Sequence, residues 1–221
     1  MDGTGSTEGG ASQRTATPDD LSMPDERLTE RKSMLRKELL AARASMSVAD
    51  RRAAGRALRD TLLGLPEMGM AGTVAAYLSV GAEPETTGLV FALWKRGTYV
   101  LLPVLRPDMD LDWASYDGPD SLRSGSTSPY GLLEPEEPPR GRDAIRSADL
   151  VIVPALAADR SGNRLGRGGG CYDRALARVA SSVPTIALLY DHELLDEVPA
   201  GVLDQRVRSV AQPGRGITRL G

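Results

Sequence analysis

The sequence of 221 residues predicts an α/β fold, with three layers (α/β/α) around a mostly parallel central sheet. Two observations predict it. Short apolar runs, typical of strands buried on both faces, alternate along the chain with segments whose apolar residues recur at helical spacing. The strongest run, DLVIVP at 149–154, is apolar after its first residue. Because parallel strands require crossover connections, this alternation favours helices on both faces of one sheet.

Helical periodicity marks the intervening segments. Residues 28–46 are rich in Leu, Ala, Arg, Lys and Glu, with apolar residues at helical spacing and one basic face. Ser47 precedes a second periodic run at 48–63 and stands three residues before Asp50, so we expect Ser47 to be its N-cap. Three further helices are expected, at 87–94 after Thr86 or Thr87, at 171–180 and at 193–197.

Six segments are expected to be strands: 73–78, 98–102, 111–116, 149–154, 184–190 and 206–211. The second should stop at Pro103, because proline cannot donate a ladder hydrogen bond. Residues 117–143 are rich in Pro, Gly and Ser, which predicts one long loop. Residues 1–27 are rich in Gly, Ser, Thr and Asp, which predicts a disordered tail and leaves 28–221 as a single domain.

Composition excludes several kinds of function. Lys and Arg total 27 against 30 Asp and Glu, and the chain has one histidine, His192, and one cysteine, Cys171. A disulfide within the chain or a Cys/His zinc site is therefore excluded, and any metal would be held mainly by oxygen, which favours Mg²⁺. The net charge of −3 and 4% aromatic content argue against nucleic-acid and membrane partners. The lack of an apolar leader predicts a cytoplasmic protein.

The most informative segment is DRSGNRLGRGGGCYDR at 159–174. It follows a predicted buried strand and precedes a predicted helix, which places it at the carboxyl edge of the sheet, where ligands bind. Its four glycines at 166–170 and four arginines suit an anion such as phosphate. The segment matches neither a P-loop nor a dinucleotide fingerprint. On the residues alone, a plain glycine-rich turn with solvated arginines is an equal alternative.

The segment RLGRGGGCYDR resembles the signature RLGxGxGYYDR of the 5-formyltetrahydrofolate cyclo-ligases, also called 5,10-methenyltetrahydrofolate synthetases. Five further blocks follow the family's order between about residues 30 and 211: KSMLR, YLSVGAEPET, LLPV, GLLEP and VPAGVLD. The resemblance implies a three-layer α/β/α enzyme. It also implies the reaction of that family, in which ATP and Mg²⁺ drive the cyclisation of 5-formyltetrahydrofolate to 5,10-methenyltetrahydrofolate, with release of ADP and phosphate.

This chemistry requires no covalent nucleophile. An N-formyl amide is a poor electrophile, and closing the ring must expel the formyl oxygen. Transfer of the γ-phosphoryl group of ATP to that oxygen makes it a leaving group, and N10 of the folate then attacks the activated carbon. The enzyme needs a phosphate cradle, positive charge and two nitrogens held close together.

The resemblance assigns roles residue by residue. ATP contacts fall on the first predicted helix and the glycine-rich segment: Lys32, Arg36, Arg164, Gly166, Arg167, Gly168, Gly169, Gly170 and Tyr172. Arg167 and Tyr172 are also the expected catalytic residues. Folate contacts are expected from Leu78 and Glu83, the glutamate accepting hydrogen bonds from the pterin N–H groups. Asp173 and Asp204 match the magnesium carboxylates.

Some residues stay open at this point. Cys171 stands where the family has a tyrosine, and we expect a small buried side chain there, not a nucleophile. Trp113 and Tyr116 could line the folate ring, but core packing is equally expected for them and for Leu78. His192 matches no motif position and is expected to be an ordinary loop residue.

Two alternative functions follow from the same residues. The departure at Cys171 is compatible with a non-catalytic sensor of folate or ATP, and a related ATP-dependent enzyme could act on another N-formyl substrate. The expected partner is a small-molecule substrate, with no nucleic acid and no membrane, for a monomer or weak dimer.

Overall fold

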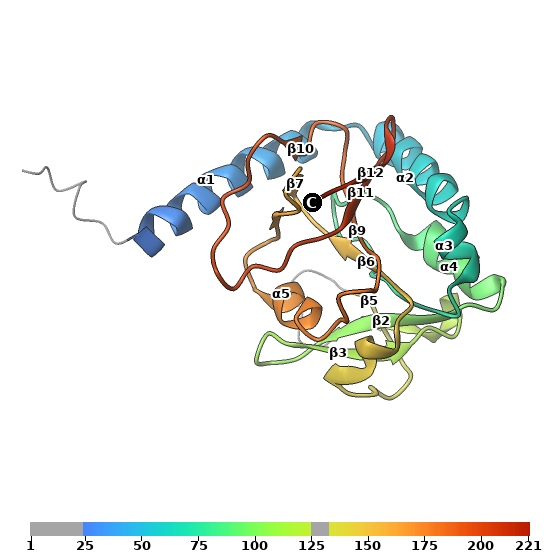
Figure 1. Cartoon of the computed structure of the whole chain (residues 1–221). Helices are drawn as coiled ribbons and strands as arrows, with labels where there is room; N and C mark the ends of the chain where they lie inside the picture. The colour runs from blue at the N-terminus through green and yellow to red at the C-terminus, as the bar shows by residue number, and fades with distance from the viewer. Residues whose placement is uncertain (1–23, 125–132) are drawn as a thin grey trace, which may run out of the picture.

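The computed structural model describes residues 24–124 and 133–221, so that 1–23 of the expected tail and 125–132 of the expected loop lie outside the described residues. The chain folds around a central sheet (Figure 1). Its seven strands are β1 (Thr73–Ala75), β2 (Tyr99–Leu105), β3 (Leu111–Ser115), β6 (Leu150–Pro154), β9 (Thr185–Leu188), β11 (Ser209–Gln212) and β12 (Gly216–Arg219).

Across the sheet the strands follow the order β12-β11-β9-β6-β1-β2-β3. The five inner strands pair in parallel, and the edge strands β12 and β3 run antiparallel to their neighbours. The central strand β6 is buried along its first four residues, as its apolar sequence predicts. The expected α/β fold with a mostly parallel sheet is thereby confirmed.

Helices cover both faces of this sheet (Figure 1). One face carries α2 (Val48–Leu63), α3 (Pro66–Met70) and α4 (Thr87–Lys95), and the other carries α5 (Cys171–Leu176) with the 3-10 helix η3 (Arg142–Ser147). Because successive strand residues point to opposite faces, Ile152 packs in the first layer and Val151 in the second. The expected three layers are therefore present.

The long helix α1 (Pro24–Ser45) lies outside these layers, beside a small second sheet (Figure 1). That sheet has the order β10-β7-β8 and consists of β7 (Ala157–Asp159), β8 (Arg164–Leu165) and β10 (Leu194–Leu195). Leu35 and Leu39 of α1 pack with Leu165, which is how the helix is attached. α1 begins at Pro24, four residues before the expected helix. Among the described helices, none is long and apolar enough to cross a membrane.

The N-terminal cap of α2 is confirmed. Oγ of Ser47 accepts a hydrogen bond from the backbone N–H of Asp50 at 3.1 Å, and the helix occupies the expected residues 48–63. Other boundaries differ. β1 ends at Ala75, α5 ends at Leu176, and α3 and β12 are elements that the sequence pattern did not predict.

Strand β2 continues through Pro103 to Leu105, so the expected stop at the proline is wrong. Pro103 pairs with Trp113 of β3, while β1 has already ended beside Leu101. On the side of β2 where β1 has ended, no strand needs a hydrogen bond from residue 103. A proline, which has no backbone N–H, is tolerated at such an edge.

The expected helix at 193–197 is also wrong, because this segment contains β10, which pairs in parallel with β7. The Glu193 side chain is fully buried and holds Arg43, so the segment is shaped by a contact with α1. The expected loop at 117–143 contains a 3-10 helix at Pro119–Ser121 and a strand pair, β4 (Leu122–Ser124) with β5 (Leu133–Pro135). Both are tertiary features without a periodic sequence signal.

Candidate active site

All residues that the sequence assigned to a site line one cavity of about 480 Å³. They come from α1, the loop after β1, strand β8, the glycine-rich loop (residues 166–170), α5 and the loop before β11: Lys32, Arg36, Leu78, Glu83, Arg164, Gly166, Arg167, Gly168, Gly169, Gly170, Tyr172, Asp173 and Asp204. The cavity therefore lies beyond the carboxyl ends of β1 and β6, where an open α/β sheet binds its ligands.

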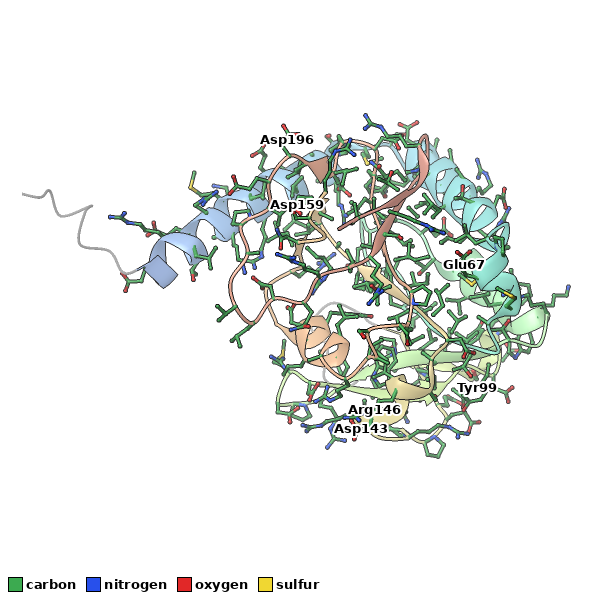
Figure 2. The ribbon with its side chains drawn as sticks, in the orientation of Figure 1. Glu67, Tyr99, Asp143, Arg146, Asp159 and Asp196 are labelled. Carbon is green, nitrogen blue, oxygen red and sulfur yellow. The ribbon has the colours of Figure 1, made fainter. Side chains whose placement is uncertain are left out.

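Asp159 organises the approach to the glycine-rich loop. Its buried carboxylate accepts hydrogen bonds from the backbone N–H groups of Ser161 and Asn163 and from that of Val198. Figure 2 shows Asp159 beside α1. One carboxylate thus fixes the turn between β7 and β8 and also the start of the segment that leads to Asp204.

Two basic residues attach α1 to the cavity wall. Nζ of Lys32 lies 2.5 Å from Oδ2 of Asp204, and Nε of Arg36 donates to the carbonyl oxygen of Gly166 at 2.9 Å. Their i, i+4 spacing puts both side chains on one side of the helix. The basic face expected from the sequence is therefore turned toward the glycine-rich loop.

Glycine is required at position 168 of this loop. Its φ is +108°, a conformation that side chains rarely adopt, and a Cβ atom there would lie 3.4 Å from Cζ of Arg36. The absence of a side chain lets the loop backbone pass directly beside the guanidinium. Backbone N–H groups and an arginine are thus brought to one wall of the cavity.

Asp173 and Asp204 belong to one charged cluster. Nη2 of Arg164 donates to Oδ1 of Asp173 at 2.8 Å, and the same oxygen accepts the backbone N–H of Gln205 at 3.1 Å. Burial raises the pKa of Asp204, but the hydrogen bonds from Gly201 N–H and Lys32 outweigh it and leave that pKa below its usual value. The Asp204 carboxylate is therefore ionised at neutral pH.

Asp173 and Asp204 carry oxygen ligands of the type that magnesium prefers. Within the described chain, each has one oxygen, Oδ2 of Asp173 and Oδ1 of Asp204, that accepts no hydrogen bond. No group of three or more His, Cys, Asp or Glu suited to a metal occurs in 24–124 and 133–221. Mg²⁺ usually takes one or two carboxylates and completes its shell with phosphate oxygens and water, so two carboxylates suffice.

Glu83 links the other end of the cavity to the glycine-rich loop. Its Oε1 accepts a hydrogen bond from Nε of Arg167 at 3.0 Å, and its Oε2 accepts the backbone N–H of Val80 at 2.9 Å. The glutamate side chain is mostly buried, whereas that of Arg167 is 40% exposed. Movement of Arg167 would therefore open one oxygen of Glu83 to a ligand.

Three cavity-lining residues hold buried polar atoms that have no hydrogen-bond partner within the described residues: Tyr77 Oη, Arg164 Nε and Tyr172 Oη. Burial raises the pKa of Tyr77 and of Tyr172, with a further increase from the Glu83 charge, so both hydroxyls are protonated donors. Buried polar groups are nearly always paired in native proteins, which makes this concentration typical of a ligand site.

Comparison with known proteins identifies the family. The family model of the 5-formyltetrahydrofolate cyclo-ligase family matches residues 28–213. The chain belongs to this family.

Two cyclo-ligases illustrate the similarity. The chain is 44% identical to 5-formyltetrahydrofolate cyclo-ligase of Mycolicibacterium smegmatis over 194 residues, covering 86% of this chain and 97% of that protein. It is 30% identical to the Escherichia coli K12 enzyme of the same name over 164 residues, covering 73% and 88%. An Aquifex aeolicus 5,10-methenyltetrahydrofolate synthetase structure matches with a TM-score of 0.73 and 28% identity, covering 86% of this chain and 92% of that one.

The sequence allowed either folate contact or core packing for three residues. Of these, Leu78 lines the cavity, but neither Trp113 nor Tyr116 does. Trp113 is fully buried in the core, and Tyr116 lines a separate hollow beside Trp94. His192 is outside the cavity as well. The apolar wall instead includes residues of β2, β3 and the turn between them: Pro103, Leu105, Met109 and Leu111.

Cys171 lines the cavity at the start of α5. Its thiol points to the carbonyl oxygen of Gly169 at 3.7 Å, and burial raises the thiol pKa. This residue is a protonated thiol at neutral pH, which agrees with the expectation that it is not a nucleophile.

Sequence reasoning missed Arg43 and Tyr77, which both line the cavity. A signal for Arg43 was available, because it follows Arg36 by seven residues and Lys32 by eleven. Those spacings put all three basic residues on one face of a helix. Tyr77 lies within an apolar run and gave no such signal.

Proposed function

We propose that this protein is an ATP- and Mg²⁺-dependent ligase that converts 5-formyltetrahydrofolate to 5,10-methenyltetrahydrofolate, ADP and phosphate. The observation that carries the proposal is the distribution of groups along one cavity. Lys32, Arg36 and the glycine-rich loop line the cavity together with Glu83 and apolar residues such as Leu78, and Arg167 of that loop contacts Glu83. Membership in the cyclo-ligase family supports the same substrate pair.

The basic end suits the triphosphate. Lys32, Arg36, Arg164 and Arg167 supply positive charge, and the glycine-rich backbone supplies N–H donors without a side chain in the way. Asp173 and Asp204 would hold Mg²⁺, which would add positive charge beside the transferred phosphoryl group. In the free protein Lys32, Arg164 and Arg167 are paired with carboxylates, and Arg36 donates to the carbonyl oxygen of Gly166. For the buried Arg164 this pairing avoids the cost of an unpaired buried charge.

The Glu83 end suits the pterin ring. Its carboxylate is positioned to accept the ring N–H groups once Arg167 turns to the phosphates, while Leu78 and Leu111 supply apolar contacts. A single cavity that binds both substrates can place the formyl oxygen against the γ-phosphorus. Positioning of this kind is the main catalytic task in phosphoryl transfer.

The reaction then has two steps. The formyl oxygen attacks the γ-phosphorus, and the bond between that phosphorus and the bridging oxygen breaks to release ADP. N10 attacks the activated formyl carbon and loses its proton, and the carbon–oxygen bond breaks to release phosphate. Arg167 and Tyr172 are the proposed catalytic residues, Arg167 by neutralising charge on the transferred group and Tyr172 as a hydroxyl donor.

A product assay tests this proposal. Purified protein with 5-formyltetrahydrofolate, ATP and Mg²⁺ should yield the absorbance of the methenyl product together with one ADP per turnover. Omission of ATP, or removal of Mg²⁺ by a chelator, should stop both signals. Binding of both ligands without ADP release would indicate a non-catalytic sensor, and ADP release with a different N-formyl compound alone would indicate another substrate.

A further inference from the structure

Arg43, near the end of α1, is an almost completely buried cation. Its Nε and Nη2 atoms donate to the two carboxylate oxygens of Glu193 at 2.6 and 2.8 Å, and Nη2 also donates to the carbonyl oxygen of Ala155 at 2.6 Å. The guanidinium stands 5.4 Å from the ring centroid of Tyr190. These contacts fix the side chain rigidly at the carboxyl ends of β6 and β9.

One nitrogen of this guanidinium is left over. Within the described chain Nη1 donates no hydrogen bond, although the Arg43 side chain is only 1% exposed and lines the cavity. Arginine carries five N–H donors, and those on Nη1 are therefore available to a ligand in the cavity. A donor held in this way at the wall of a ligand cavity indicates an acceptor on the ligand.

Tyr77 provides a second unpaired donor beside it. Tyr77 is 3% exposed and lines the cavity, and its hydroxyl has no hydrogen-bond partner within the described residues. Apart from burial, the largest influences on its pKa are the charges of Glu83, which raises it, and Arg43, which lowers it. Tyr190, whose ring faces Arg43, donates its hydroxyl to the carbonyl oxygen of Ala82, next to Glu83. Arg43, Tyr77 and Glu83 therefore line the same part of the cavity, here called its floor.

The length of α1 separates this floor from the phosphate end. Arg43 follows Lys32 by eleven residues, which at 1.5 Å per residue is about 16 Å along the helix. Lys32 is held at the far end by Asp204, so Arg43 cannot serve the same phosphate group.

We infer that Arg43 and Tyr77 donate hydrogen bonds to the carbonyl oxygen at C4 of the pterin ring. The inference rests on the proposed function and refines it. A pterin presents N–H donors at C2 and N3 directly beside that oxygen, so a carboxylate next to two donors matches this edge of the ring. The same carbonyl is adjacent to the N5 formyl group, and its capture by Arg43 and Tyr77 would orient the reacting formyl oxygen.

The Tyr77→Phe variant provides the first test. Because the hydroxyl has no protein partner, its removal should leave thermal stability unchanged or higher, while calorimetry should show about five- to tenfold weaker binding of 5-formyltetrahydrofolate. Binding of ATP should not change. The matched control is Tyr116→Phe, another buried tyrosine outside the cavity, which should leave folate binding as in the unchanged protein. Unchanged folate binding in Tyr77→Phe would overturn the inference for Tyr77.

Arg43 needs a paired substitution, since its removal alone would leave Glu193 as a buried carboxylate without its cation and with only the backbone N–H of Tyr190 as a donor among the described residues. The double variant Arg43→Met with Glu193→Leu replaces both charges by apolar groups of similar size and should remain folded, as circular dichroism would check. Its folate binding should fall about tenfold or more, with ATP binding retained. Unchanged binding of 5-formyltetrahydrofolate by the folded double variant would overturn the inference for Arg43. If the double variant does not fold, the preference of the unchanged protein between 4-oxo and 4-amino analogues decides.

A folate analogue with a 4-amino group in place of the 4-oxo group gives a readout that a structural role would not move. The Arg43 guanidinium can only donate to an acceptor, so the unchanged protein should bind the 4-oxo compound at least tenfold more tightly. Tyr77→Phe removes a donor to the 4-oxo group and should reduce that preference. Equal binding of both compounds by the unchanged protein would overturn the inference. Failure of the proposed function is distinct, because it would appear as an absence of methenyl product from the unchanged protein.

Discussion

Nε of Arg167 donates to Oε1 of Glu83 at 3.0 Å, so the glycine-rich loop and the loop after β1 are joined inside the cavity by one ion pair. The two residues belong to opposite tasks in the proposed reaction, one for the phosphates and one for the pterin ring. In the free protein the two side chains bind each other, and ligand binding would separate them. This pairing links the two halves of the site.

Separate substitutions of these two residues should affect different substrates. Glu83→Gln should raise the KM for 5-formyltetrahydrofolate about tenfold and spare ATP binding, because a neutral amide is a weaker acceptor for pterin N–H groups. Arg167→Ala should raise the KM for ATP or lower kcat by about tenfold or more, because a charge-assisted phosphate contact is lost. Steady-state kinetics with each substrate varied in turn would check both.

Stability provides the control for this pair. Since the Arg167 side chain is 40% exposed, the ion pair should contribute less than about 1 kcal/mol to the free energy of unfolding. Both variants should therefore denature in urea close to the unchanged protein. The reverse kinetic pattern, with Glu83 affecting ATP and Arg167 affecting folate, would contradict the assignment.

Gly168→Ala should impair ATP binding as well as stability. The alanine would have to adopt a φ of +108° and press its Cβ against Arg36, so we expect about 1–2 kcal/mol of strain and about a tenfold higher KM for ATP. Gly216→Ala is the matched control, because Gly216 also has a positive φ, +69°, but faces open space at the first residue of β12. The control should lose stability and keep its KM; equal effects on KM would remove Gly168 from the site.

Asp110→Asn should destabilise the protein only above the acid range. Hydrogen bonds from Arg178 hold the pKa of Asp110 below its usual value, so this carboxylate stabilises the fold above the unfolded pKa of about 4 and loses that effect as the pH falls through its folded pKa. Urea denaturation should show a loss of about 2 kcal/mol at pH 7, shrinking below about pH 4. A loss that stayed constant down to pH 3 would contradict this.

The control for Asp110 is Asp60→Asn on α2. That carboxylate is mostly exposed and pairs with its neighbour Arg59, so its removal should change the free energy of unfolding by less than about 0.5 kcal/mol at any pH. Comparison of the two variants separates the buried network of Asp110 from the general effect of removing one negative charge.

Cys171→Ala should retain activity. The thiol is half-buried and its pKa is raised by that burial, so iodoacetamide should alkylate it slowly at pH 7, and much faster once the protein is unfolded in denaturant. The alkylation rate is measured by mass spectrometry of the single cysteine. Rapid modification of the folded protein, or loss of turnover in a folded Cys171→Ala variant, would reopen a chemical role for this residue.

The sequence by itself determined the parts with a local signal. Apolar periodicity located α2 and the central strand β6, and the Ser47 cap fixed the start of α2. The ordered motif blocks named the residues that line the cavity, since each block carries its chemistry in adjacent positions. Local propensity and spacing suffice where a residue's role depends on its own element.

The tertiary structure decided everything that depends on a partner far along the chain. The segment at 193–197 is not helical, because the Glu193 side chain binds Arg43. Pro103 is part of β2, because β1 has already ended beside Leu101. The ion pair between Lys32 and Asp204 joins residues 172 positions apart. No periodicity encodes such contacts, because burial and charge pairing in the folded state create them.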